Sequence, residues 1–169
     1  LYGFDIEAKR NLGFITPKLS NFSLGANFSY IISNTDIDSA EFQLVLDFDP
    51  DAEMSREMFG QAPYVFNALA SYRTDNGITA NLAFNVVGPR LAVITVGATP
   101  DYELRPQPSL NFNITKAFGP EQKLSVRLAA NNLLAPDYQV TATYRDTEFP
   151  ITVFETARVF SATFNYRFK

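Results

Sequence analysis

Carboxylates gather in residues 47–57, and their spacing is the best candidate for metal chemistry in the chain. Four of them stand at alternate positions: Asp47, Asp49, Asp51 and Glu53. Carboxylates at every second position can converge on Ca²⁺ in a loop. However, Ala52 stands at the sixth position, where a calcium loop needs glycine, and Pro50 interrupts the pattern. We keep calcium as a hypothesis, favour a solvated acidic loop, and predict no other metal and no cofactor.

The composition restricts the chemistry further. The 169 residues contain no histidine and no cysteine, which excludes thiolate nucleophiles, Ser-His dyads and disulfide scaffolds. The net charge of -4 offers no basic face to nucleic acid. Arg90 and Arg105 could pair with an anionic substrate, although we favour a strand exit with its charge at lipid headgroups. We therefore predict that the chain is not an enzyme and does not bind nucleic acid.

Apolar and polar residues alternate along most of the chain. The alternation runs through residues 2–9, 22–33, 64–73, 78–86, 109–115, 124–131 and 160–168. A period of two predicts strands, and no window predicts a helix. We estimate strand lengths of about 10 to 13 residues, nearer to membrane strands than to globular ones. Asn, Ser and Thr dominate the polar positions, which suits a hydrated interior better than an open solvent face.

The connections between these strands alternate in length. Short connections occupy residues 11–20, 74–77 and 119–122, and long ones occupy about 35–61, 89–107 and 135–156. This order is typical of an up-and-down outer-membrane barrel, with short periplasmic turns and long external loops. Because the last long loop precedes the last strand, we expect Lys169 and the C-terminus on the periplasmic side of the outer membrane. Residues 138–147 also alternate and could extend the last hairpin above the membrane.

The two registers predict two environments. Aromatic residues near both strand ends indicate membrane belts, although core packing would explain any one of them alone. The predicted lipid-facing residues are Tyr64, Phe66, Tyr72, Phe84, Phe112, Phe118 and Phe160. The predicted lumen-facing residues are Asn67, Asn81, Asn85, Asn111, Asn113, Asn131 and Arg127. An arginine at the lipid midplane would cost about 2–4 kcal/mol, which supports the lumen register of Arg127.

Four strings occur in order along the chain: GQAPYVFN at 60–67, FNVVGPR at 84–90, NNLLAPDY at 131–138 and FNYRFK at 164–169. Together they resemble the C-terminal barrel of TonB-dependent outer-membrane receptors, the Bacteroidetes type above all, over essentially the whole chain. The resemblance implies an all-β, transmembrane antiparallel barrel. Residues 1–169 would form about the last seven of 22 strands, as the C-terminal part of the barrel, with the plug domain and TonB box absent.

The resemblance also implies a function. Such receptors import siderophore-, cobalamin-, glycan- or peptide-like substrates with energy that TonB transmits. The implied partners are outer-membrane lipid, the remaining strands and plug domain, TonB through the missing N-terminal part, and the barrel-assembly machinery. The implied C-terminal assembly signal consists of Phe164, Tyr166 and Phe168. Chains of the family usually finish on an aromatic residue, whereas Lys169 follows Phe168 here.

Two other classes fit parts of the pattern. A small complete eight-stranded outer-membrane barrel, with its eighth strand in 138–147, would have a structural or adhesive role. A soluble binding module, such as a sandwich or a lipocalin-like barrel, would expose apolar faces far larger than the usual patches on soluble proteins.

Overall fold

The computed structural model describes residues 1–47, 49–95, 99–119, 121–144 and 147–168. Phe48 of the acidic segment, Pro120 of the third short turn and the C-terminal Lys169 lie outside the described residues. So do residues 96–98 and 145–146, which belong to two of the long connections.

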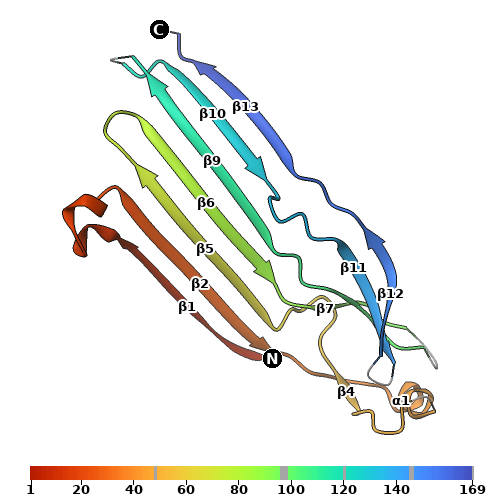
Figure 1. Cartoon of the computed structure of the whole chain (residues 1–169). Helices are drawn as coiled ribbons and strands as arrows, with labels where there is room; N and C mark the ends of the chain where they lie inside the picture. Colours follow the sequence, from red (N-terminus) through yellow and green to blue (C-terminus); the bar gives the residue numbers. More distant parts are fainter. Residues whose placement is uncertain (48, 96–98, 120, 145–146, 169) are drawn as a thin grey trace.

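Seven antiparallel strands form one curved sheet in chain order, β1-β2-β5-β6-β9-β10-β13 (Figure 1). Their bounds are Tyr2–Asn11, Phe22–Ile32, Tyr64–Arg73, Ile78–Val87, Ser109–Phe118, Leu124–Asn131 and Val159–Tyr166. The seven strands and their up-and-down order are confirmed. The shortest has 8 residues and the longest 11, so they are slightly shorter than the predicted 10 to 13.

Three short connections lie at one end of this sheet, together with the C-terminus (Figure 1). We call this the short-turn end. The first connection contains two short 3-10 helices, η1 (Leu12–Phe14) and η2 (Pro17–Leu19). The second is a tight turn in which the Gly77 N–H donates to the Thr74 carbonyl at 3.2 Å. Gly77 has φ 83, a left-handed conformation that glycine adopts without steric cost.

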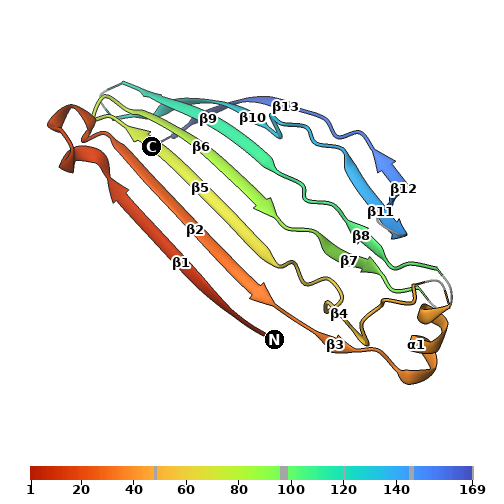
Figure 2. The same ribbon diagram turned by 60° about the horizontal axis from the view of Figure 1, so that its bottom comes forward.

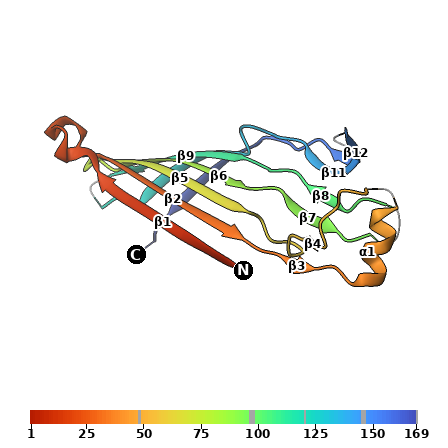
Figure 3. The ribbon, with the colours of Figure 1, turned by 90° about the horizontal axis from the view of Figure 1, so that it is seen from below.

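The long connections fold together at the other end, which we call the loop end. Strands β7 (Arg90–Val93), β8 (Tyr102–Leu104), β11 (Tyr138–Tyr144) and β12 (Thr147–Phe154) form a second sheet in the order β12-β11-β8-β7. Two further short strands, β3 (Thr35–Asp36) and β4 (Ser55–Arg56), pair with each other. Figures 2 and 3 show helix α1 and the β11–β12 hairpin at opposite margins of this end.

Helix α1 (Ser39–Leu46) corrects the prediction that no segment is helical. The side chain of Asp38 accepts a hydrogen bond from the Ala40 N–H at 2.9 Å, and Glu41 lies in the first turn. Both features stabilise a helix N-terminus. An acidic cap followed three residues later by glutamate is a sequence signal for a helix start, so this element was readable from the chain.

The eight-stranded alternative is wrong for the described residues. Residues 138–144 form β11, which pairs with β8 and β12 rather than with any strand of the seven-stranded sheet. Strands β1 and β13 remain at the two edges of that sheet. The β11–β12 hairpin instead extends the chain beyond the seven strands, as the alternation in 138–147 suggested.

In the part of the chain that the structure describes, the buried apolar residues all lie at the loop end. They are Ile37, Ala62, Leu91, Leu104, Val140 and Ala142. The structure describes every residue of the seven long strands, and none of them is buried. Among the described residues, no helix is long and apolar enough to cross a membrane.

Candidate functional site

Strand register gives the seven-stranded sheet two chemically distinct faces. In the register, Glu7 lies opposite Asn27, Asn27 opposite Asn67, and Asn67 opposite Asn85. Because residues paired across strands project to the same side, the odd-numbered residues of the seven strands form one face and the even-numbered residues the other. We call them the polar face and the apolar face.

Side-chain amides link the strands along the polar face. Asn67 Nδ2 donates to Asn27 Oδ1 at 2.7 Å, and Asn85 Nδ2 donates to Asn67 Oδ1 at 2.5 Å. A second chain runs from the Ser71 hydroxyl to Asn81 Oδ1 at 2.9 Å and from Asn81 Nδ2 to Asn113 Oδ1 at 3.3 Å. Each of these two amide rows crosses neighbouring strands, and the uncharged polar groups within a row form hydrogen bonds with one another.

Every residue predicted to face the lumen lies on this polar face: Asn67, Asn81, Asn85, Asn111, Asn113, Asn131 and Arg127. Arg127 lies between Thr115 and Thr163 in the register. The side chain of Asn111 accepts a hydrogen bond from the Asn132 N–H at 2.9 Å. This asparagine therefore binds the backbone just after β10, whereas those of the amide rows bind other side chains.

The apolar face carries all the residues predicted to face lipid: Tyr64, Phe66, Tyr72, Phe84, Phe112, Phe118 and Phe160. Exposure differs along this face: Phe112 is 36% exposed and Phe160 71%, whereas the four aromatic residues of β5 and β6 are half-buried. Within the seven fully described strands, the only charged residues of this face are Arg10 and Lys116. Both stand near the short-turn end, where a long cationic side chain can reach an interface.

The three residues of the predicted assembly signal gather at the end of the edge strand β13. Phe164 and Tyr166 lie on the apolar face and are 73% and 57% exposed. Phe168 follows the strand, and its ring lies edge-on to that of Tyr166 with the centroids 4.8 Å apart. The signal residues therefore form one exposed aromatic group.

Two carboxylates of the acidic segment, residues 47–57, take part in local backbone structure. Asp47 ends helix α1, and Asp49 Oδ1 accepts a hydrogen bond from the Asp51 N–H at 3.3 Å. No group of three or more carboxylates in the described part of the chain is placed to hold a metal ion. The geometry therefore gives no support to the calcium hypothesis for Asp47, Asp49, Asp51 and Glu53.

An electrostatic centre that the sequence analysis missed lies at Arg56. Its guanidinium lies 2.5 Å from Glu41 of α1 and 2.9 Å from Asp101, and Asp101 also accepts the Thr95 N–H at 2.8 Å. Burial lowers the pKa of Arg56, but hydrogen bonds and charge from Asp101 and Glu41 outweigh it, so the pKa is raised. The readable signal was a lone base among the eight carboxylates of residues 36–57.

Two other polar side chains of the loop end also bind neighbouring residues. Arg105 forms an ion pair with Glu148 of β12, so it is not a free ligand for an anionic substrate. Asn132 adopts the left-handed conformation, φ 55, and its side chain donates to the Thr156 hydroxyl and the Ala157 carbonyl, both at 3.0 Å. This contact ties the exit of β10 to the segment that enters β13, and it gives a structural role to the second asparagine of the string at 131–138.

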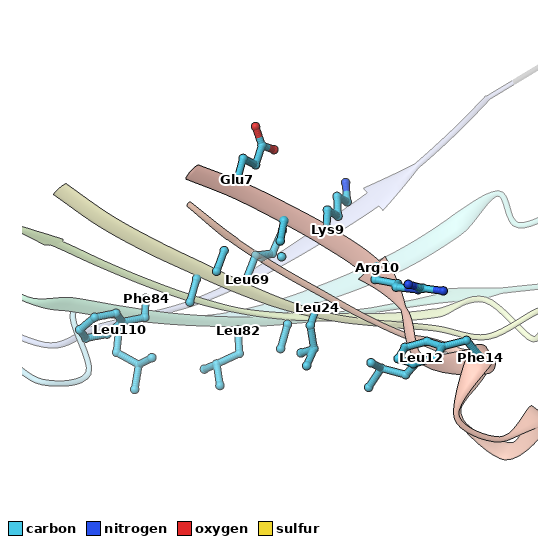
Figure 4. A pocket seen from close by; sticks show the side chains of 15 residues that line it. Glu7, Lys9, Arg10, Leu12, Phe14, Leu24, Leu69, Leu82, Phe84 and Leu110 are labelled. Atoms are coloured by element: carbon cyan, nitrogen blue, oxygen red, sulfur yellow. The ribbon is translucent and has the colours of Figure 1, made fainter. Parts of the chain in front are cut away.

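A hollow of about 840 Å³ lies against the sheet beside β1 (Figure 4). Figure 4 shows Glu7 and Lys9 on one side of the ribbon and Leu24, Leu82 and Leu110 on the other. The hollow is lined mostly by residues of the apolar face, and Glu7 and Lys9 of the polar face also line it.

Comparison with known proteins gives a match in structure alone. No family model and no curated protein matches the chain. The crystal structure of the ferric citrate transporter FecA in its unliganded form matches 98% of the chain with a TM-score of 0.67 and 17% sequence identity. The chain spans 24% of that protein's length. The chain therefore has the fold of a segment of the barrel of a TonB-dependent outer-membrane receptor.

Proposed function

We propose that this chain forms part of the wall of a TonB-dependent transport receptor in the outer membrane. The observation that carries the proposal is the uncovered apolar face, which spans seven strands and has charges only near the short-turn end. On a soluble protein such a face would be an aggregation surface. In a bilayer the same face is the lipid contact of a barrel, with the polar face turned to the lumen.

The proposal assigns separate tasks to the parts of the chain. The apolar face contacts outer-membrane lipid, and the amide rows contact water or a plug domain in the lumen. Strands β1 and β13 pair with the remaining barrel strands, because an unpaired strand edge is costly in lipid. The loop end contributes to substrate capture on the cell surface. TonB acts through an N-terminal part, and the barrel-assembly machinery recognises Phe164, Tyr166 and Phe168.

The substrate class follows from the resemblance and stays broad: a siderophore-, cobalamin-, glycan- or peptide-like molecule. The matched structure is a ferric citrate transporter, which fits the import role without fixing the cargo. At the loop end, Arg105 is paired with Glu148 and Arg56 with two carboxylates. Carboxylates therefore already engage these two described cations of the loop end, whereas none of the ion pairs involves Arg90.

Two adjacent residues test which face meets lipid. The chain has no cysteine, so Leu82→Cys and Ala83→Cys give single labelling sites on the apolar and polar faces of β6. A nitroxide at 82 should be accessible to oxygen and one at 83 to a water-soluble nickel complex, in the full-length protein reconstituted in vesicles. Equal water access at both positions would contradict the proposal.

Orientation needs a separate measurement. We propose that the short-turn end and the C-terminus are periplasmic. Gln43→Cys in α1 and Asp75→Cys in the β5–β6 turn place thiols on exposed residues at opposite ends of the chain. A membrane-impermeant maleimide should label residue 43 on intact cells and residue 75 only after the outer membrane is opened. The reverse pattern would show that the chain is inverted.

A further inference from the structure

The hollow on the apolar face is built from small residues. Ala8, Ala26 and Ala68 are cross-strand partners on β1, β2 and β5, and all three line it. Leu24 and Leu82 also line it and project from the sheet, with 49% and 41% of their surface exposed. Short side chains between long ones recess the surface, so the face carries a groove here. The volume of about 840 Å³ lies within the range of small-ligand pockets.

A cation stands at one end of this groove. Arg10 lines it, and its guanidinium carbon lies 4.3 Å from the centre of the Phe14 ring, which is also part of the lining (Figure 4). Among the described residues Arg10 has no carboxylate partner, since the ion pairs involve other cations. An exposed guanidinium stacked on an aromatic ring retains its N–H donors for an incoming acceptor.

The second cation of the face provides a contrast. Lys116 Nζ donates to the Asn76 carbonyl at 2.5 Å, so the turn already satisfies part of its hydrogen bonding. Lys116 does not line the groove. Lys9 and Glu7 also line the hollow, but their side chains lie on the other side of the ribbon from Leu24 and Leu82 (Figure 4). Arg10 is therefore the cation on the apolar side of the groove, with an apolar floor running away from it along the strands.

We propose that this groove holds one phospholipid, with an acyl chain over the alanine floor and the headgroup phosphate at Arg10. A phosphate accepts paired hydrogen bonds from a guanidinium, and an apolar floor at membrane depth selects a chain of methylene groups. The inference rests on the proposed function, because the apolar face meets lipid only in a membrane. Free phosphate would use Arg10 alone and would gain nothing from the floor.

The test compares variants of the full-length protein by native mass spectrometry from detergent, with phosphatidylglycerol as the probe. Arg10→Gln should lower retention of one phosphatidylglycerol about fivefold, the effect of one cation near an anionic membrane surface. Arg10→Lys should restore part of the retention. Ala68→Leu should lower retention without changing charge, and Lys116→Gln should leave it unchanged.

Three results would overturn the lipid site: unchanged retention in Arg10→Gln, an equal loss in Lys116→Gln, or full competition by inorganic phosphate. Diacylglycerol, which has the chains but no phosphate, should be retained equally by the wild-type protein and Arg10→Gln. The labelling at residues 82 and 83 separates the two proposals. Lipid access at 82 together with unchanged phosphatidylglycerol retention in Arg10→Gln would remove the lipid site and leave the proposed function in place.

Discussion

The side-chain nitrogen of Asn67 lies 2.7 Å from the side-chain oxygen of Asn27 across the β2–β5 pair. The oxygen of the same Asn67 amide accepts from Asn85 on the next strand. One amide group thus joins three strands on the polar face. A slip of one residue would turn Asn67 to the apolar face and break both hydrogen bonds, so this row fixes the register of the strands as well as stabilising them.

Asn67→Ala should therefore destabilise the protein by about 1–2 kcal/mol, since it removes two hydrogen bonds of roughly 1 kcal/mol each. Asn113→Ala removes a single bond of 3.3 Å and should cost less. Urea unfolding of the folded protein in vesicles, followed by tyrosine fluorescence, measures both. A midpoint for Asn67→Ala equal to that of the wild-type protein would mean that its row does not contribute to stability.

Gly77→Ala should cost more than Gly119→Ala, although both residues occupy the left-handed region, with φ 83 and 82. A Cβ on Gly77 would lie 3.1 Å from the Ala117 carbonyl oxygen, whereas a Cβ on Gly119 would have no neighbour within 4 Å. Backbone strain of about 1 kcal/mol is common to both, and only the first adds a close contact. Gel electrophoresis in the cold, after samples are heated to increasing temperatures, gives the temperature at which each variant loses its folded band. This temperature should be lower for Gly77→Ala, and the opposite order would contradict the contact expected at Ala117.

The seven strands and the composition of their two faces were predictable because the side-chain period of a strand links sequence position directly to face. Asn67 and Phe84 needed only their parity to be placed on opposite faces of the sheet. The loop-end sheet was not predictable in this way. β8 has 3 residues and β7 has 4, too few alternations to stand out, and their pairing depends on contacts distant in sequence. Arg56 was missed for the same reason, because Asp101 is 45 residues away.

Arg56→Gln should loosen helix α1 from the loop end. The change leaves Glu41 and Asp101 without their shared cation, and these side chains are only 21% and 26% exposed. We expect a local cost of about 1–2 kcal/mol, above that of a surface pair and below that of a buried one. Hydrogen exchange of the α1 amides should speed up by the corresponding factor of about 5 to 30.

Arg105→Gln is the matched control for Arg56→Gln. It removes the more exposed ion pair with Glu148, which involves β12 rather than α1. Exchange in α1 should stay at the wild-type rate in this variant. If both variants accelerated exchange in α1 equally, the effect would come from the loss of positive charge at the loop end and not from the contacts of Arg56.

The pH dependence of the loop end should carry the signature of Glu57. Burial and the neighbouring carboxylate of Glu103 raise the pKa of Glu57, so the folded loop end holds this proton more tightly than the unfolded chain does. The unfavourable contribution of the ionised carboxylate is therefore absent below the pKa of an unfolded glutamate. It grows as the pH rises through the higher folded pKa, and it is complete above that value. Because Glu57 as a whole is exposed, the effect should be small.

Amide exchange in β3 and β4, corrected for the intrinsic pH dependence of exchange, should thus show less protection at neutral pH than at mildly acidic pH. Glu57→Gln should remove this step, because glutamine cannot ionise and the charge of Glu103 then has no carboxylate to repel at that position. If acidification still increased the protection of the β3 and β4 amides in Glu57→Gln, the titrating group would be a residue other than Glu57. A step of opposite sign, with protection lost on acidification, would mean that an ion pair such as Arg56 with Glu41 dominates the loop end, and that the repulsion between Glu57 and Glu103 is negligible beside it.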